Sequence, residues 1–197
     1  MVNVKPSINS QINKAMSTQK WALDTTHTNI QFKAKHLMIT TVTGNFGSVE
    51  GSVEMEGEDF TTGKYTFAAD VASVTTGSQD RDNHLRSDDF FNAEEYPKLT
   101  FVGSEVSNVK DNEFDLTGEM TIRDVTKPVT IRIEVGGTVV DPWGNTKAAF
   151  SFKGSLNRKD FGLKFHVVNE AGNLLVSDEI KLEGEVQLAK VAEEVEA

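Results

Sequence analysis

The sequence predicts an all-β protein: an antiparallel barrel of about eight strands with one short helix over about residues 78–92. Through most of the chain, apolar and polar residues alternate with a period of two. This alternation is typical of strands that turn one face to a core and the other to water. The links between these segments are short, and a single helical segment interrupts them, which argues against a sheet built from alternating strands and helices.

Closure of the sheet is favoured because many long strands would otherwise leave exposed edges. A sandwich of two sheets remains the structural alternative at this point. The alternating segments run from residue 21 to residue 189, and the first of them begins at 21–24. The inward residues of the next eight segments are predicted to be Ile30, Phe32, Ala34 and His36; Val49, Gly51, Val53 and Met55; Tyr65, Phe67, Ala69 and Val71; Leu99, Phe101 and Gly103; Phe114, Leu116, Gly118, Met120 and Ile122; Val129, Ile131, Ile133 and Val135; Ala148, Phe150, Phe152, Gly154 and Leu156; and Ile180, Leu182, Gly184, Val186 and Leu188.

Five glycines fall on this inward face: Gly51, Gly103, Gly118, Gly154 and Gly184. Glycines in strands allow bulges and bends that let a sheet curl. They also leave space where side chains would otherwise point into the barrel. We expect bending first, and both effects are compatible. Because the inward set is almost wholly apolar, a ligand held inside would be mostly hydrocarbon.

One segment, residues 76–97, breaks the alternation. Gly77 and Ser78 indicate a helix start, and Pro97 marks the end of the segment. On a helix, Asp82 and Arg86 would form a pair four residues apart. Asp80, His84 and Asp88 would share one stripe, but one imidazole with two carboxylates is a weak metal set, so no metal is expected. A solvated helix and a polar rim that orients a ligand headgroup both remain open.

Charge and composition exclude several classes of function. Lys and Arg number 20 against 30 Asp and Glu, a net charge of -10, which argues against nucleic acid as a partner and against an anionic membrane surface. No apolar run approaches the roughly 18 residues of a membrane span, so stable membrane insertion is not expected. The chain has no cysteine, which excludes disulfides and thiolate chemistry.

The two ends differ from the middle. Residues 1–20 read as a flexible lead-in, with a short helix near Ile8 to Met16 as one possibility, and residues 190–197 read as an acidic tail. Neither contains the apolar stretch of a secretory signal, so the sequence predicts a cytoplasmic location. Residues 21–189 form the predicted domain.

Five motifs in order resemble the YceI-like family. WALDTTHTNIQFKAKHL is similar to its opening W-x-x-D-x-x-H-S-x-I-x-F-x-x-x-H, and RDNHLRSDDFFNAEEYP to its R-D-x-H-L-R-S-x-D-F-F segment. LTGEMTIRDVTKPVTI, NRKDFGL and VSDEIKLEGEVQL resemble its later strand pair, turn and closing strand. The resemblance implies an extended, lipocalin-like barrel that binds a polyisoprenoid such as a quinone or a prenyl phosphate, without catalysis and with no cofactor besides the lipid. Family members are often periplasmic or secreted.

The candidate site residues follow from the inward pattern together with this resemblance. The apolar tunnel is predicted to be lined by Ile30, Phe32, Val53, Phe67, Val71, Phe101, Leu116, Met120, Ile131, Ile133, Phe150, Phe152 and Leu182. The polar headgroup or mouth is assigned to His36, Arg81, His84, Arg86 and Arg158. For His36 a core role competes with a ligand contact. For Arg158 a structural ion pair with Asp160 is favoured over a ligand contact.

Three functions compete on the sequence alone. A carrier of a long-chain lipid is favoured, with a hydrophobic small molecule as the partner and a homodimer possible. An enzyme is less favoured, because no catalytic triad, nucleophile elbow or phosphate-cradling loop is found. A barrel filled by its own phenylalanines, which would serve as a stress or interaction module, is the remaining alternative.

Overall fold

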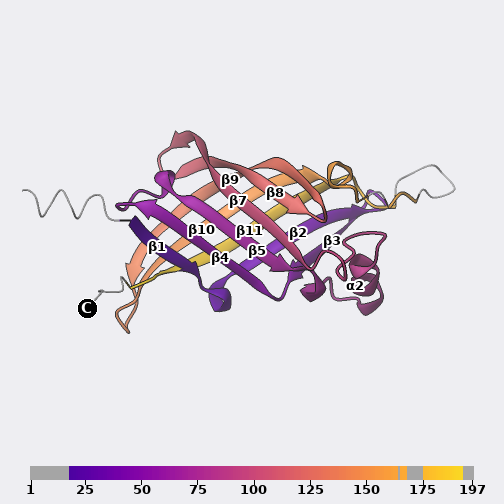
Figure 1. The fold of residues 1–197 in the computed structure, drawn as a ribbon, viewed down its shortest axis with the longest axis horizontal. Coiled ribbons are helices and arrows are strands. Elements are labelled where there is room, and N and C mark those ends of the chain that lie inside the picture. The colour runs from indigo at the N-terminus through magenta and orange to yellow at the C-terminus, as the bar shows by residue number, and fades with distance from the viewer. Residues whose placement is uncertain (1–17, 164, 168–174, 193–197) are drawn as a thin grey trace, which may run out of the picture.

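Eleven strands form one antiparallel sheet within residues 18–163, 165–167 and 175–192, the part of the chain that the computed structural model describes (Figure 1). The strands are β1 (Thr18–Leu23), β2 (Asn29–His36), β3 (Thr40–Phe46), β4 (Val49–Glu56), β5 (Lys64–Asp70), β6 (Val74–Thr75), β7 (Lys98–Lys110), β8 (Glu113–Ile122), β9 (Val125–Val140), β10 (Thr146–Asn157) and β11 (Glu179–Lys190). Short 3-10 turns η1 (Thr25–His27), η2 (Phe60–Thr62), η3 (Val71–Ser73) and η4 (Arg158–Phe161) and one helix, α2 (Gln79–Arg86), connect them.

The sheet closes on itself. Its order is β1-β4-β5-β7-β8-β9-β10-β11, and β11 pairs back onto β1, which makes a ring of eight strands. One edge of β11 serves two partners in succession, because residues 188–190 pair with β1 and residues 181–185 pair with β2. From β2 the sheet continues to β3 and β6 at the end of the barrel that carries α2 (Figure 1). The predicted antiparallel barrel is therefore confirmed, and the sandwich alternative is excluded by the closure.

The change of partner along β11 depends on a short break between β1 and β2. Asp24 ends β1, and its carboxylate accepts hydrogen bonds from the backbone N–H and the hydroxyl of Thr26, at 3.2 and 2.6 Å. Its other oxygen accepts from Lys147 Nζ at 2.9 Å and from Gln187 Nε2 at 3.0 Å. One carboxylate thus fixes the η1 turn and joins it to β10 and β11.

Two strands were not predicted, and one boundary moves. The sequence patterns did not predict β3 and β6. β1 begins at Thr18, so the last part of the predicted lead-in pairs with β4, beginning with Thr18 opposite Glu56. The rest of that lead-in, including the suggested helix near Ile8 to Met16, and the tail beyond Ala192 lie outside the described residues.

The helix is shorter than predicted. α2 ends at Arg86, because the Ser87 N–H and hydroxyl both donate to the His84 carbonyl and the chain then turns away. Asn92 adopts a left-handed backbone with φ 49°, which no continuing helix permits. Residues 87–97 therefore form turns that pack against the end of the barrel.

The inward glycines receive neighbouring aromatic rings. A Cβ on Gly184 would lie 2.6 Å from Cε1 of Phe152, its cross-strand partner, and one on Gly118 would lie 2.7 Å from Cζ of Phe101. The rings rest against the wall where the glycines stand, an arrangement known to stabilise designed sheets. The pairing of β7 and β8 also shifts after Gly103, as bending requires. Bending is therefore supported at Gly103, whereas the space at Gly118 and Gly184 is taken up by neighbouring rings.

Candidate functional site

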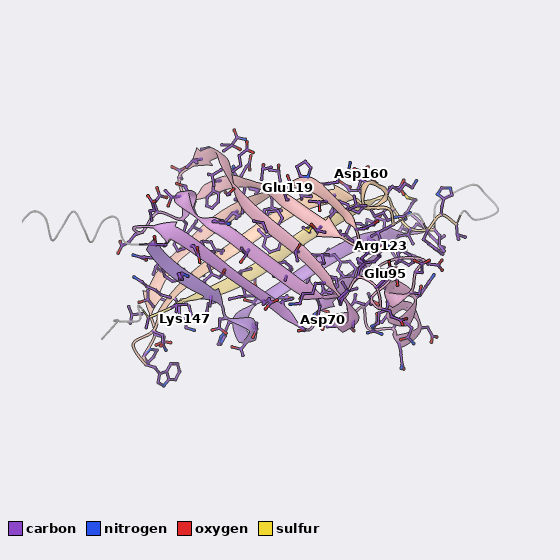
Figure 2. All side chains as sticks on the ribbon, in the orientation of Figure 1. Asp70, Glu95, Glu119, Arg123, Lys147 and Asp160 are labelled. Atoms are coloured by element: carbon purple, nitrogen blue, oxygen red, sulfur yellow. The ribbon has the colours of Figure 1, made fainter. Side chains whose placement is uncertain are left out.

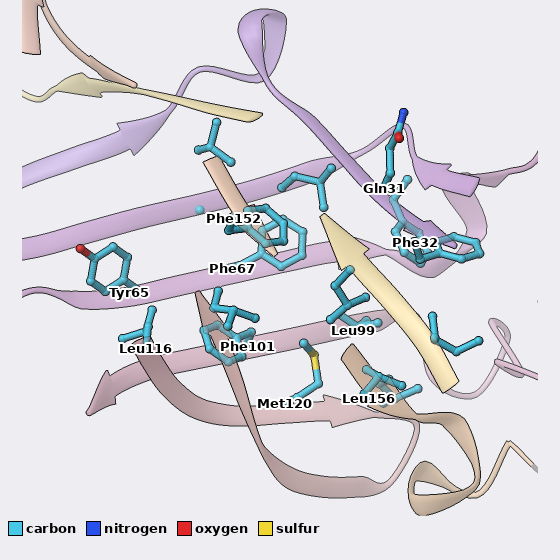
Figure 3. Close-up of a pocket in the computed structure, with 18 of the residues that line it drawn as sticks. Gln31, Phe32, Tyr65, Phe67, Leu99, Phe101, Leu116, Met120, Phe152 and Leu156 are labelled. Carbon is cyan, nitrogen blue, oxygen red and sulfur yellow. The ribbon is translucent and has the colours of Figure 1, made fainter. Parts of the chain in front are cut away.

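A cavity of about 250 Å³ lies inside the barrel and is bounded almost entirely by apolar side chains (Figure 3). Its lining comes from β1, β2, β4, β5, β7, β8, β9, β10 and β11, from the β3 end at Phe46, and from the α2 segment. Along β11 the lining runs from Ile180 to Leu188, which at ~3.3 Å per residue and a typical strand tilt corresponds to a depth of about 20 Å. The barrel is therefore not filled by its own phenylalanines.

The residues predicted to form the tunnel lie on this lining, with one exception. Val71 is buried but lies outside the cavity lining, because Asp70 caps η3 and turns the chain out of β5 before residue 71. Its assignment to the tunnel is corrected. The cavity also includes apolar residues that the site prediction omitted, namely Leu23, Ala34, Phe46, Leu85, Phe90, Phe91, Leu99, Ile122, Leu156, Leu163, Val176, Ile180, Val186 and Leu188.

One end of the cavity is closed by aromatic packing. Trp21, Phe60 and Phe150 are all buried, and the Phe60 ring lies 5.4 Å from Trp21 and 4.8 Å from Phe150 between centroids. Tyr65 lines the cavity beside this cluster and donates its hydroxyl hydrogen to the Phe60 carbonyl at 2.7 Å. Burial, followed by the negative charge of Asp59, raises the pKa of Tyr65, so the phenol stays neutral. We call this the closed end.

The opposite end, which carries α2, is the mouth of the cavity. Leu85, Ala34 and Val176 line the cavity there and are half-buried, whereas Phe150 and Leu188 at the closed end are buried. Leu85 of α2 and Val176 of the segment before β11 thus border the cavity at this end, which we call the mouth.

Arg158 lies at the mouth with a side chain that is 2% exposed, and its hydrogen-bond donors already have acceptors. Its guanidinium donates to the carbonyl oxygens of Leu163, Phe165 and Ser177 at 2.7–3.0 Å, and to Asp178 Oδ1 at 3.0 Å. Burial lowers its pKa, and the charge of Asp178 opposes this effect. Arg158 therefore holds two loops together at the mouth. The ion pair foreseen with Asp160 is instead made with Asp178.

The arginines of the α2 segment also hold the fold together. Arg86 donates to the carbonyl oxygens of Ala72 and Val74, each at 2.7 Å, and Arg81 donates to the hydroxyl and carbonyl of Thr76. These contacts attach α2 to the barrel rim. Neither arginine is on the cavity lining.

Asp82 turns inward and does not form the predicted pair with Arg86. Its carboxylate accepts from the Thr76 N–H and hydroxyl at 2.7 and 2.6 Å and from the Thr75 hydroxyl at 3.2 Å. Burial opposes its ionisation, but these hydrogen bonds and the charge of Arg86 outweigh it, so the pKa of Asp82 is lowered.

His84 and His36 lie at the rim of the mouth and not on the cavity lining. The His84 ring packs edge-on against Phe90 and Phe165, at 5.1 and 4.9 Å, and its Nε2 lies 2.8 Å from Asp89 Oδ2. His36 is half-buried at the end of β2, in an isolated antiparallel bridge with Val176. The structure thus places both histidines beside the cavity, at the end of the barrel that carries α2.

Arg123 is a site residue that sequence reasoning missed. It sits in the β8–β9 turn with φ 57° and donates to the carbonyls of Asp88 and Phe90 and to the Asp88 carboxylate, at 2.8–3.2 Å. Figure 2 shows it at the end of the barrel that carries α2, while the labelled Glu119 and Lys147 lie further along the outer surface. Its position directly after a strand gave no signal of a contact with residues more than thirty positions earlier.

This arrangement can enclose an apolar chain. Within the described residues, no three His, Cys, Asp or Glu side chains come together as a metal site. No helix in the same part of the chain is long and apolar enough to cross a membrane. Besides Arg158, the polar lining residues are Gln31 of β2, Ser52 of β4 and Thr66 of β5, and the hydroxyls of Ser52 and Thr66 bond to each other.

Comparisons with known proteins agree over nearly the whole domain. The model of the YceI-like domain matches residues 21–188. A UPF0312 protein of Staphylococcus epidermidis is 34% identical over 171 residues, which cover 86% of this chain and 97% of the relative. Among solved structures, a YceI protein of Campylobacter jejuni is 34% identical with a TM-score of 0.68, and covers 87% of this chain and 97% of its own.

Two more distant structures share the fold alone. BcnA of Burkholderia cenocepacia has a TM-score of 0.72 at 21% identity, over 84% of this chain and 98% of its own. A polyisoprenoid binding domain from Saccharophagus degradans, implicated in plant cell wall breakdown, has a TM-score of 0.64 at 16% identity, over 87% of this chain and 98% of its own.

Proposed function

Because this chain belongs to the YceI-like family, we propose that it is a non-catalytic carrier of a long-chain isoprenoid lipid, whose tail occupies the barrel cavity. The observation that carries the proposal is the apolar pocket of about 20 Å depth inside the barrel. Burial of hydrocarbon contributes about 25 cal/mol per Å², so a chain along this wall would bind strongly without any polar contact. The binding of a polyisoprenoid by the Saccharophagus degradans domain, which has the same fold, supports this choice of ligand.

The ligand enters tail first in this proposal. The closed end offers the aromatic rings of Trp21, Phe60 and Phe150, which suit a hydrocarbon terminus and not a hydrated headgroup. The mouth carries His36 and His84 at its rim, where a headgroup remains in contact with water. The long axis of the lipid then follows the barrel axis.

An uncharged headgroup, such as that of a quinone or a prenol, is preferred over a phosphate. Arg81, Arg86 and Arg158 donate to protein oxygens within the described residues, and His84 pairs with Asp89. A phosphate at the mouth would have to displace one of these contacts while it lies near Asp88 and Asp89. A neutral headgroup neither has to displace one of these contacts nor is repelled by the two carboxylates.

Thermal unfolding in the presence of lipid tests the carrier function. A saturating prenol at about 100 times its Kd adds about 2.7 kcal/mol, or roughly 5–10 °C in Tm for a domain of this size. Leu182→Trp, which places an indole on the cavity wall, is expected to abolish the shift. Lys181→Trp is the matched control, because the neighbouring residue is exposed on the outer face and leaves the cavity unchanged.

Two results would contradict the proposal. One is an unchanged Tm of the unsubstituted protein with every prenol from farnesol to solanesol and with ubiquinone. The other is an equal Tm shift in L182W and the unsubstituted protein, because the lipid would then bind outside the cavity. Geranylgeranyl phosphate is compared with geranylgeraniol in the same assay, and tighter binding of the phosphate would overturn the preference for a neutral headgroup.

A further inference from the structure

The β2–β3 hairpin ends in a turn whose residues are both exposed and apolar. Leu37, Met38 and Ile39 form its tip, with exposed fractions of 38%, 60% and 80%. The Ile39 N–H donates to the His36 carbonyl at 3.1 Å, which closes a four-residue turn with Leu37 and Met38 in its centre. No other stretch of three consecutive large apolar residues is exposed in the described part of the chain.

The backbone of this turn is unsuited to its residues. Leu37 has φ 50° and Met38 has φ 61°, so both central residues adopt the left-handed conformation of a type I′ turn. Asn-Gly or Asp-Gly are the residues that such a turn favours, because a bulky side chain is strained there. The tip is thus both strained and exposed to water, and neither property benefits the fold. Strain of this kind, where the surrounding structure imposes it, indicates a functional site.

The tip adjoins the mouth of the cavity. Leu37 donates its backbone N–H to the Leu175 carbonyl, and His36 pairs with Val176, which lines the cavity. Ala34, two residues before His36 on β2, is also on the lining. The hairpin tip therefore lies beside the segment that lines the mouth of the pocket.

The charge of the hairpin itself differs from that of the whole molecule. The chain has a net charge of -10, yet residues 25–49 contain no Asp or Glu and include Lys33 and Lys35. Lys33 pairs with Glu183, whereas Lys35 is exposed and bonds to the Thr41 hydroxyl at 2.9 Å. The hairpin is thus a long stretch without its own carboxylates, so it meets less repulsion at a layer of lipid phosphates than the acidic remainder.

We propose that this hairpin tip docks on a lipid bilayer surface, with Leu37, Met38 and Ile39 in the interfacial layer, and thereby brings the mouth against the membrane that holds the ligand. The biological role of docking rests on the proposed carrier function. Docking itself does not, because it needs only the exposed tip. Partial insertion of a few apolar side chains gives reversible binding, which suits a carrier that must leave again.

The double variant L37N/M38G tests the docking, because it is expected to weaken vesicle binding without loss of thermal stability. Asn-Gly suits the turn, so the variant is expected to unfold at an equal or higher temperature than the unsubstituted protein. Flotation with phosphatidylcholine vesicles is expected to fall by roughly tenfold or more, because two apolar side chains no longer enter the bilayer. Trp143→Ser is the matched control, since Trp143 is 83% exposed but lies in the β9–β10 turn at the other end.

Uptake of ubiquinone separates this inference from the carrier proposal. L37N/M38G is expected to bind ubiquinone from a detergent dispersion as the unsubstituted protein does, and to extract it from vesicles at least tenfold more slowly. Equal extraction rates, equal flotation, or loss of flotation in W143S instead would overturn the docking. A change of oligomeric state in L37N/M38G without vesicles would also overturn it, by assigning the tip to a second copy. Failure of both proteins to bind ubiquinone in detergent would count against the carrier function and leave the flotation result to decide the docking.

Discussion

At the scale of single residues, Arg158 is the side chain on which the mouth depends most. It is buried, and it donates to carbonyl oxygens on both loops that border the cavity as well as to Asp178. Moving the guanidinium out of water costs free energy. Its removal, however, leaves several buried acceptors without donors. Its contribution is therefore a matter of geometry, and a lysine cannot reproduce it.

We expect Arg158→Met to lower the free energy of unfolding by about 3 kcal/mol, and Arg158→Lys to recover little of this loss. Urea unfolding followed by circular dichroism measures both. Lys159→Met is the control, because Lys159 also pairs with Asp178, at 2.8 Å, but is 39% exposed. Its loss should cost less than about 1 kcal/mol, and a cost equal to that of R158M would show that Asp178, not the guanidinium, governs stability.

Trp21 differs from Arg158 in that its buried hydrogen-bond donor has no acceptor in the described part of the chain. Its ring packs against Phe60 at the closed end, but its Nε1 has no hydrogen-bond partner within the described residues. Trp21→Phe removes the unpaired donor and keeps an aromatic ring, so we expect a change in stability of less than about 1 kcal/mol. Trp21→Ala should cost about 4 kcal/mol through the cavity that it leaves. A large loss in W21F, measured by thermal unfolding, would show that the N–H is bonded after all.

The sequence could predict which side chains point inward, and far less about what they contact. Alternation places Phe101, Leu116 and Phe152 on one face without any knowledge of their neighbours. Polar motif residues near a mouth suggest ligand contacts, so the sequence predicts that Arg81, Arg86 and Arg158 meet a headgroup. Their acceptors are main-chain carbonyls of distant turns, and no side-chain pattern in a sequence reports where carbonyl groups lie.

Among the elements, the junction between β1 and β2 is stabilised by one ionised group. Hydrogen bonds from Thr26, and then the one from the Lys147 ammonium, hold the pKa of Asp24 well below its ordinary value despite partial burial. Since the folded-state pKa is depressed, the stabilisation is fully present above the unfolded-state pKa, near 4, and is lost as the pH falls toward the folded-state value.

We therefore expect Asp24→Asn to lose about 1 kcal/mol at pH 7, a figure that allows for solvent screening of the exposed part of the cluster. The difference from the unsubstituted protein should shrink as the pH falls below about 4. Urea unfolding across this pH range measures both curves. Glu58→Gln serves as the control, because Glu58 is exposed and has no hydrogen bond in the described structure. A difference that stayed constant with pH would assign the effect to the shape of the side chain.

The turns after α2 depend on Arg123 from the other side of the barrel end. Arg123→Ala removes three hydrogen bonds to Asp88 and Phe90, so we expect the amides of residues 90–92 to exchange with solvent roughly tenfold faster. Hydrogen exchange with mass spectrometry measures this. Arg132→Ala, which removes contacts to Glu113 and Asp115 on the barrel wall, should leave these amides unchanged.

The longer of the two strands that sequence reasoning missed, β3, shows where alternation fails. β3 reads TTVTGNF, with a glycine at the buried position and threonines on the outer side, so it carries too few apolar residues to show a period of two. Its inward glycine is covered by the Phe32 ring of the neighbouring strand. The apolar side chain that covers this position thus belongs to β2. Only the pairing of β2 with β3 brings it over the glycine.

For the whole molecule, the carrier proposal predicts the orientation of the lipid from the shape of the pocket. With the tail at the aromatic closed end, a quinone headgroup would remain at the rim near His36 and His84. We expect dithionite to reduce protein-bound ubiquinone at a rate within about tenfold of the rate in detergent micelles, as followed by absorbance. A headgroup buried at the closed end would be protected and reduced far more slowly, which would contradict tail-first binding.

The aromatic cluster at Trp21, Phe60 and Phe150 has a consequence for how cargo is exchanged. In the carrier proposed above, a lipid that enters beside α2 meets this cluster at the far end, so it leaves from the end at which it entered. Donor and acceptor would then meet the same end of the barrel in turn. A carrier of this kind takes one lipid at a time from one to the other, unlike a fixed duct that connects them.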